Sequence, residues 1–131
     1  MNTKLLLTAS AFVLGALGIA GSFLPQELLA ALGVAPSGVL ALLVQLLAAL
    51  LFAFSMVNWM ARGSLIGGIY NRPVAIGNLT HFVIGALALA KAVMAGQRHP
   101  IVLVLAAIYV VFAIGFAALF VRSPVKELER A

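Results

Sequence analysis

Four long apolar runs constrain this chain more than any other feature of its sequence. They extend over about residues 5–24, 39–60, 73–95 and 100–121. Because a helix rises by about 1.5 Å per residue, a run of roughly 20 residues matches the ~30 Å hydrocarbon core of a bilayer. Helices are predicted rather than strands, since an open sheet in lipid would leave backbone groups unpaired. The runs occupy most of the 131 residues, which predicts one transmembrane domain over residues 1–131.

The low charge content supports a membrane fold. Only 8% of the residues are charged, whereas a soluble globular domain has about 25%. Between the first two runs, Pro25 opens a short segment, Glu27 lies in its first turn and Gly33 closes it, a pattern typical of a short helix. We therefore predict an all-α membrane protein, a bundle of four transmembrane helices with a short interfacial helix between the first and second. This plan resembles that of many small four-helix bacterial membrane proteins.

The basic residues predict how the chain is oriented in the membrane. One side of the predicted bundle receives Lys4, Arg62, Arg72, Arg122, Lys126 and Arg130, whereas the other receives Arg98, with Lys91 near the same end of the third run. Cytoplasmic loops carry the excess of lysine and arginine. Both termini and the central loop are therefore expected to be cytoplasmic, in a bacterial inner (plasma) membrane. The basic residues form no patch on a polar face, so nucleic-acid binding is not expected.

The first run is expected to stay in the protein as a transmembrane span. Ala20, Gly21 and Ser22 imitate the small residues of a signal-peptide cleavage region. The run is near the upper length limit for a secretory signal, and a single lysine precedes it. We therefore expect that it is not cleaved.

Small residues recur at helical spacing in three of the runs. They lie at Ala11, Gly15, Gly18 and Ser22 in the first run; at Gly77, Gly85, Ala88 and Ala92, with His81 among them, in the third; and at Ala106, Ala113 and Ala117, with Tyr109 among them, in the fourth. Helices in lipid associate through close packing of small residues. These stripes predict helix contacts and indicate that His81 and Tyr109 point into the bundle.

Four polar residues of the cytoplasmic half are candidate ligand-binding residues: Asn58, Asn78, His81 and Tyr109. Strongly polar side chains inside a membrane are costly, and so they often mark functional sites. One interpretation is a polar pocket in which His81 accepts a proton or contacts a ligand. The other, which we prefer, is that Asn58, Asn78 and His81 only form hydrogen bonds between helices.

A second polar group is predicted near the outer side. It consists of Glu27, Gln45 and Lys91. One interpretation pairs Lys91 with Glu27 and places Gln45 alongside. In the preferred alternative, the Lys91 stem lies in lipid while its ammonium reaches the headgroups.

The residue inventory argues against several kinds of site. The chain has no cysteine, which excludes disulfides, thiolate catalysis and thiolate metal ligands. Of its two histidines, His81 lies in a span and His99 in the opposite loop, so one chain offers no paired histidines for haem. A zinc site lacks further ligands at suitable spacing. We predict no catalytic residue, no metal and no cofactor.

The function predicted from these features is that of a non-enzymatic accessory or structural protein. Its expected partners are membrane lipids and a second copy or another membrane protein. One alternative is a small transporter or hydrophobic-ligand-binding protein, although the intramembrane glutamate of small multidrug transporters is missing from the first run. A further alternative is a membrane enzyme that acts on lipid or quinone.

Overall fold

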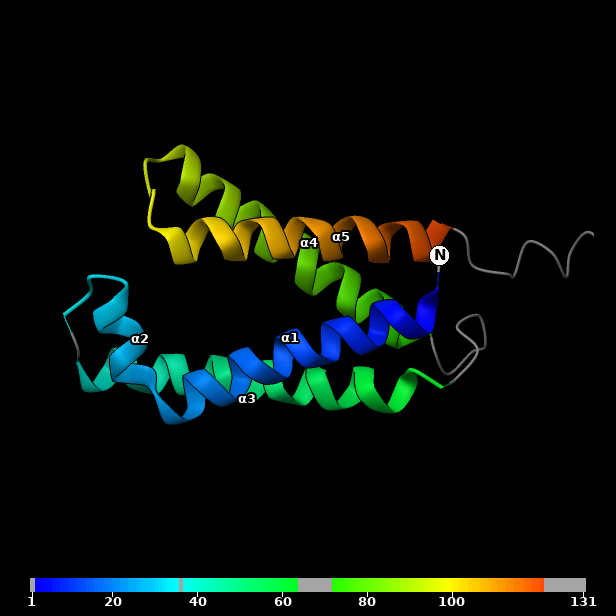
Figure 1. Cartoon of the computed structure of the whole chain (residues 1–131), viewed down its shortest axis with the longest axis horizontal. Helices are drawn as coiled ribbons and strands as arrows, with labels where there is room; N and C mark the ends of the chain where they lie inside the picture. Colours follow the sequence, from blue (N-terminus) through cyan, green and yellow to red (C-terminus); the bar gives the residue numbers. More distant parts are fainter. Residues whose placement is uncertain (1, 36, 64–71, 122–131) are drawn as a thin grey trace, which may run out of the picture. The chain divides into compact units, whose positions relative to one another are not determined.

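The computed structural model describes residues 2–35, 37–63 and 72–121, and the elements in this part of the chain are helices (Figure 1). They are α1 (Thr3–Phe23), α2 (Pro25–Ala31), α3 (Gly38–Ala61), α4 (Arg72–Met94) and α5 (Pro100–Val121). The helices α1, α3, α4 and α5 are long and apolar enough to cross a membrane. The predicted four long helices and one short helix are thus confirmed. The C-terminal basic residues used for the orientation lie outside the described residues.

Polar side chains define where two of the long helices begin. The Asn2 Oδ1 atom accepts a hydrogen bond from the Leu5 N–H group at 3.2 Å. The Ser37 Oγ atom likewise accepts one from the Leu40 N–H group at 3.2 Å. The first N–H groups of a helix have no partner within it, and a cap of this kind satisfies one of them. Short polar residues at these two positions therefore fix the starts of α1 and α3.

Two glycines terminate helices with a left-handed backbone. Gly33 has a φ of 73° after α2, and Gly96 has a φ of 101° after α4. After α2, the Val34 N–H group donates to the Leu29 carbonyl at 2.9 Å, which is the closing bond of a Schellman motif. The short helix therefore ends at Ala31, just before the predicted Gly33.

The chain forms two compact units. The first, the α1–α3 unit, comprises residues 7–60, and the second, the α4–α5 unit, comprises residues 1–6 and 61–131. Each has its own helix packing and is described by itself. The single domain predicted from the sequence stays a prediction.

The α1–α3 unit is packed through the small-residue stripe of α1. Ala11, Gly15 and Gly18 are buried. A Cβ atom at Gly18 would lie 2.8 Å from the Phe52 backbone nitrogen and 2.9 Å from the Ala48 carbonyl oxygen. The backbones of α1 and α3 therefore approach each other closely, and the predicted stripe is confirmed at these three positions.

Aromatic rings pack at the contact of α4 with α5. Phe82 is fully buried, and its ring centroid lies 4.9 Å from that of Phe112 and 5.6 Å from that of Phe116 in stacked arrangements. The predicted alanine stripe of α5 (Ala106, Ala113 and Ala117) is only half-buried. On α4, Ala88 is exposed, so its predicted place on the packing face was wrong. The prediction from small-residue spacing did not consider the phenylalanines on a neighbouring face of each helix.

Candidate functional site

The structure brings together two of the four predicted ligand-binding residues. The His81 Nε2 atom of α4 and the Tyr109 hydroxyl of α5 form a hydrogen bond of 3.1 Å. Their rings also contact each other, with centroids 5.4 Å apart. Gly85 lies beside the Tyr109 ring and leaves room for it because it has no side chain. Both residues face their partner helix, as their positions in the stripes predicted.

The other two candidates form hydrogen bonds in separate parts of the fold. Asn78 is fully buried, and its Nδ2 atom donates to the Val74 carbonyl of the same helix at 2.9 Å. Asn58 belongs to the α1–α3 unit, where its Nδ2 atom donates to the Ser10 Oγ atom at 3.0 Å. A common pocket of all four residues stays a prediction.

Two serines complete a polar network between α1 and α3. The Ser10 hydroxyl, which accepts from Asn58, donates to the Leu7 carbonyl at 3.0 Å. One turn away, the Ser55 hydroxyl donates to the Ala11 carbonyl of α1 at 2.7 Å. Ser10 was not predicted as a site residue. Its position directly before the small residue Ala11 is the sequence signal that places it near the helix contact.

The predicted outer polar group is only partly defined. The Gln45 Nε2 atom of α3 donates to the Ser22 carbonyl of α1 at 3.3 Å. Glu27 lies in the first turn of α2 and is exposed. Lys91 is exposed in the last turn of α4, in the other unit. The pairing of Lys91 with Glu27 therefore stays a prediction.

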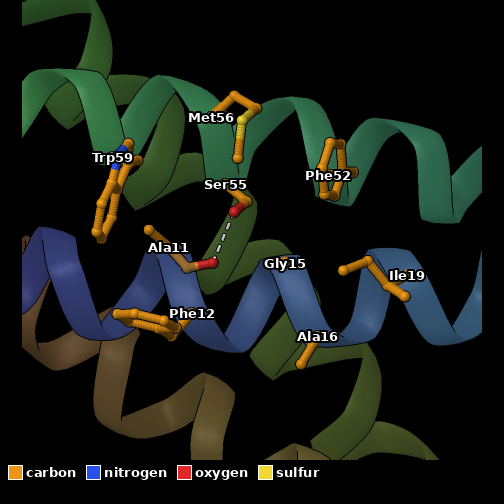
Figure 2. A pocket seen from close by; sticks show the side chains of 9 residues that line it. All are labelled: Ala11, Phe12, Gly15, Ala16, Ile19, Phe52, Ser55, Met56 and Trp59. Carbon is orange, nitrogen blue, oxygen red and sulfur yellow. Dashed lines mark hydrogen bonds between the residues drawn. The ribbon is translucent and has the colours of Figure 1, made fainter.

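An apolar groove of about 440 Å³ runs between α1 and α3 (Figure 2). Phe12 and Trp59 lie at one end, and Ile19 and Phe52 lie at the other. The Phe12 and Trp59 rings meet edge to face, with centroids 5.6 Å apart and planes at 86°. The complete lining consists of Ala11, Phe12, Gly15, Ala16, Ile19, Phe52, Ser55, Met56 and Trp59.

The groove is not among the sites predicted from the sequence. Its signal lies beside the small-residue stripe, where Phe12, Ala16 and Ile19 recur at intervals of four and three residues. Large side chains that flank a small one on the same helix face leave a hollow between them. The sequence shows this pattern in α1, but it does not show which residues of α3 form the opposite wall.

No protein-family model, curated protein or solved structure matches the chain. Within residues 2–35, 37–63 and 72–121, no group of three histidine, aspartate or glutamate side chains is placed to hold a metal ion.

Proposed function

We propose that the chain is a multi-pass protein of a bacterial inner membrane, with both termini in the cytoplasm. Its exposed surface supports this placement. Leu46 of α3, Leu87 of α4 and Val111 of α5 are 60%, 66% and 66% exposed. In water, large exposed apolar patches promote association. In a membrane they are stable, because lipid tails are as apolar as the side chains themselves. The excess of lysine and arginine on one side supports the orientation.

Within this membrane, the chain acts as a non-enzymatic accessory or structural component. The observation that carries this proposal is the use of the buried polar side chains. Ser10, Ser55, Asn58 and Asn78 are all buried, and each donates a hydrogen bond to another group of the chain. Two of these bonds lie within one helix and two join α3 to α1, which is what a packing role requires.

The His81–Tyr109 pair fits the same role. Each residue is the other's hydrogen-bond partner, and Phe82 packs edge to face against both rings, with centroids 5.1 Å and 5.2 Å away. A hydrogen bond between transmembrane helices stabilises by only ~0.6 kcal/mol on average. The pair therefore sets the register of α4 against α5 at a small gain in stability.

Conservative substitution of this pair tests the proposal. His81→Phe keeps the ring and removes the hydrogen bond, so we expect a loss of about 0.6 kcal/mol in detergent unfolding titrations. Tyr109→Phe should cost a similar amount, and the double variant should lose less than the sum, because no polar group is then left without its partner. The three variants and the wild type are compared in one double-mutant cycle.

The same variants separate packing from chemistry. Wild-type and His81→Phe proteoliposomes are incubated with membrane lipid extract and quinone, and the products are measured by mass spectrometry. We expect identical product profiles. A product that forms with the wild type and is lost in His81→Phe, while the fold is retained, would contradict the non-enzymatic proposal.

Binding of a hydrophobic ligand is a second candidate function, and the groove between α1 and α3 favours it. Its volume of about 440 Å³ falls within the ~300–1,000 Å³ of small-molecule sites. The lining is apolar apart from Ser55, whose hydroxyl donates a hydrogen bond to the Ala11 carbonyl. Such a site selects ligands by shape and apolar surface rather than by hydrogen bonds.

A further inference from the structure

The turn between α4 and α5, residues 95–99, is fixed at its two ends by different chemistry. At the end of α4, the Gln97 N–H group donates to the Ala92 carbonyl at 3.0 Å. The Gly96 N–H group donates to the Val93 carbonyl at 3.1 Å. With the left-handed backbone of Gly96, these two bonds form a Schellman motif. Both bonds join backbone groups, so a change of pH near neutrality does not alter them.

At the start of α5, His99 is the capping residue. Its carbonyl accepts a hydrogen bond from the Leu103 N–H group at 3.1 Å. Pro100, the first helical residue, has no N–H group to satisfy. The Ile101 N–H group, which has no partner within the helix, donates to the His99 Nδ1 atom at 3.3 Å. An imidazole nitrogen therefore supplies the N-cap that a side-chain oxygen supplies at the starts of α1 and α3.

The protonation state of the His99 imidazole determines whether this cap can form. In the neutral ring one nitrogen is an acceptor, and the bond from Ile101 requires that this nitrogen is Nδ1. In the imidazolium both nitrogens are donors, so Nδ1 can no longer accept. The imidazolium also places a positive charge at the N-terminus of a helix, where the helix dipole disfavours cations. Protonation therefore breaks the cap and destabilises the first turn of α5.

The groups around the turn bring no negative charge to a protonated His99. Arg98 precedes it and Lys91 lies in the last turn of α4, and both side chains are exposed cations. The first turn of α5 contains no acidic residue, and the described residues of the α4–α5 unit include no aspartate or glutamate. The titratable side chains of His81 and Tyr109 lie roughly 15 Å or more away along their helices. Within the turn, histidine is the residue type that changes its charge between about pH 5 and 8.

We propose that the turn between α4 and α5 is a pH-sensitive switch, in which protonation of His99 uncaps α5 and loosens its first turn while the end of α4 stays closed. Ile101 and Val102 of this first turn are half-buried, so loosening it weakens this end of the contact between α4 and α5. The stability that the cap supplies is present when the imidazole is neutral, and it is lost as the pH falls.

The proposed topology places this switch on the periplasmic side of the inner membrane. The turn follows α4, whose first residue, Arg72, belongs to the cytoplasmic side. The switch therefore responds to the pH outside the cell rather than to that of the cytoplasm. Only this exposure rests on the proposed function; the switch itself is a property of the turn.

Hydrogen exchange of the Ile101 amide, measured by NMR in detergent micelles at about pH 8 and about pH 5, tests the switch. Each rate is divided by that of an unstructured peptide at the same pH, which gives a protection factor. His99→Asn supplies a cap that does not titrate, and His99→Ala removes the cap. At the higher pH we expect the wild type to match His99→Asn and His99→Ala to be about fivefold less protected, which corresponds to the ~1 kcal/mol of a helix cap. At the lower pH the wild type should fall to the level of His99→Ala, whereas His99→Asn keeps its protection.

The Gln97 amide is the internal control, because its bond to the Ala92 carbonyl lies in the same turn and contains no titratable group. Its protection factor should be the same at both pH values in all three proteins. The same pH response of Ile101 in the wild type and in His99→Asn, or no response in the wild type, would overturn the switch. A loss of protection at Gln97 as large as that at Ile101 would also overturn it, in favour of a general acid unfolding. In micelles, none of these results depends on how the chain is oriented in a membrane.

Discussion

Replacing Phe82 with alanine is expected to destabilise the α4–α5 unit by about 3 kcal/mol, the lower end of the range for buried phenylalanines. Phe82 is fully buried, and its ring contacts the rings of His81, Tyr109, Phe112 and Phe116. Alanine would leave a cavity at the centre of this cluster. We expect the lower end of the range because lipid and detergent also solvate apolar groups of the unfolded protein. The substitution therefore removes mainly the packing contacts of the Phe82 ring.

The free energy of unfolding is measured by titration with a denaturing detergent, with Leu87→Ala as the control on the same helix. Leu87 is 66% exposed, so its truncation leaves no cavity and should change the stability by less than about 0.5 kcal/mol. Equal effects of the two substitutions would show that the aromatic cluster does not hold α4 against α5.

A leucine at Gly18 is expected to separate α1 from α3 and to destabilise their unit by about 3 kcal/mol, as overpacking of a tight contact does. Even a Cβ atom at this position would lie 2.8 Å from the Phe52 backbone nitrogen and 2.9 Å from the Ala48 carbonyl oxygen. Backbone atoms cannot rotate away, so the helices must move apart. The hydrogen bond from Ser55 to the Ala11 carbonyl, 2.7 Å long, should lengthen or break.

Gly38→Leu is the matched control for this substitution. Gly38 is the first residue of α3, and a Cβ atom there would meet no atom within 4 Å. The control should keep the wild-type unfolding free energy, because the added side chain extends into open space. If Gly18→Leu unfolds at the same detergent fraction as Gly38→Leu, then the close approach of α1 to α3 does not contribute to stability.

The sequence predicts the elements of this fold well because each element is specified locally. A run of apolar residues predicts a long helix wherever lipid or protein surrounds it, and the four runs agree with α1, α3, α4 and α5 to within two residues at each end. The end of α2 also follows from local chemistry, since Gly33 adopts the left-handed backbone that ends a helix.

Packing partners were harder to predict because they depend on which faces meet. The glycines of α1 were correctly assigned to a helix contact, since only small residues allow two backbones to approach closely. On α5, the alanine stripe was predicted to form the helix contact, whereas Phe112 and Phe116 pack against Phe82. All faces of α5 are apolar, so periodicity alone does not distinguish the packed face from the lipid-facing one.

For the candidate sites, too, features of a single helix were predicted and features shared by two helices were not. The sequence predicted that His81 and Tyr109 point into the bundle, because polar residues on apolar helices avoid lipid. It did not predict that the two side chains form a hydrogen bond with each other. The groove beside Gly15 was missed because its walls come from α1 and α3 together. A hollow between two helices depends on their separation and rotation, and neither is encoded in the pattern of one helix.

Labelling of single cysteines tests the proposed membrane topology most directly, because the chain has no cysteine of its own. Gly63→Cys, just after α3, and Gln97→Cys, just after α4, place one exposed thiol before α4 in the chain and one after it. A maleimide that does not cross membranes is applied to intact bacterial spheroplasts and then to lysed ones. The proposal predicts that Gln97→Cys reacts in intact spheroplasts and that Gly63→Cys reacts only after lysis. Reaction of both thiols before lysis, or of neither, would contradict a chain that crosses the inner membrane with a cytoplasmic central loop.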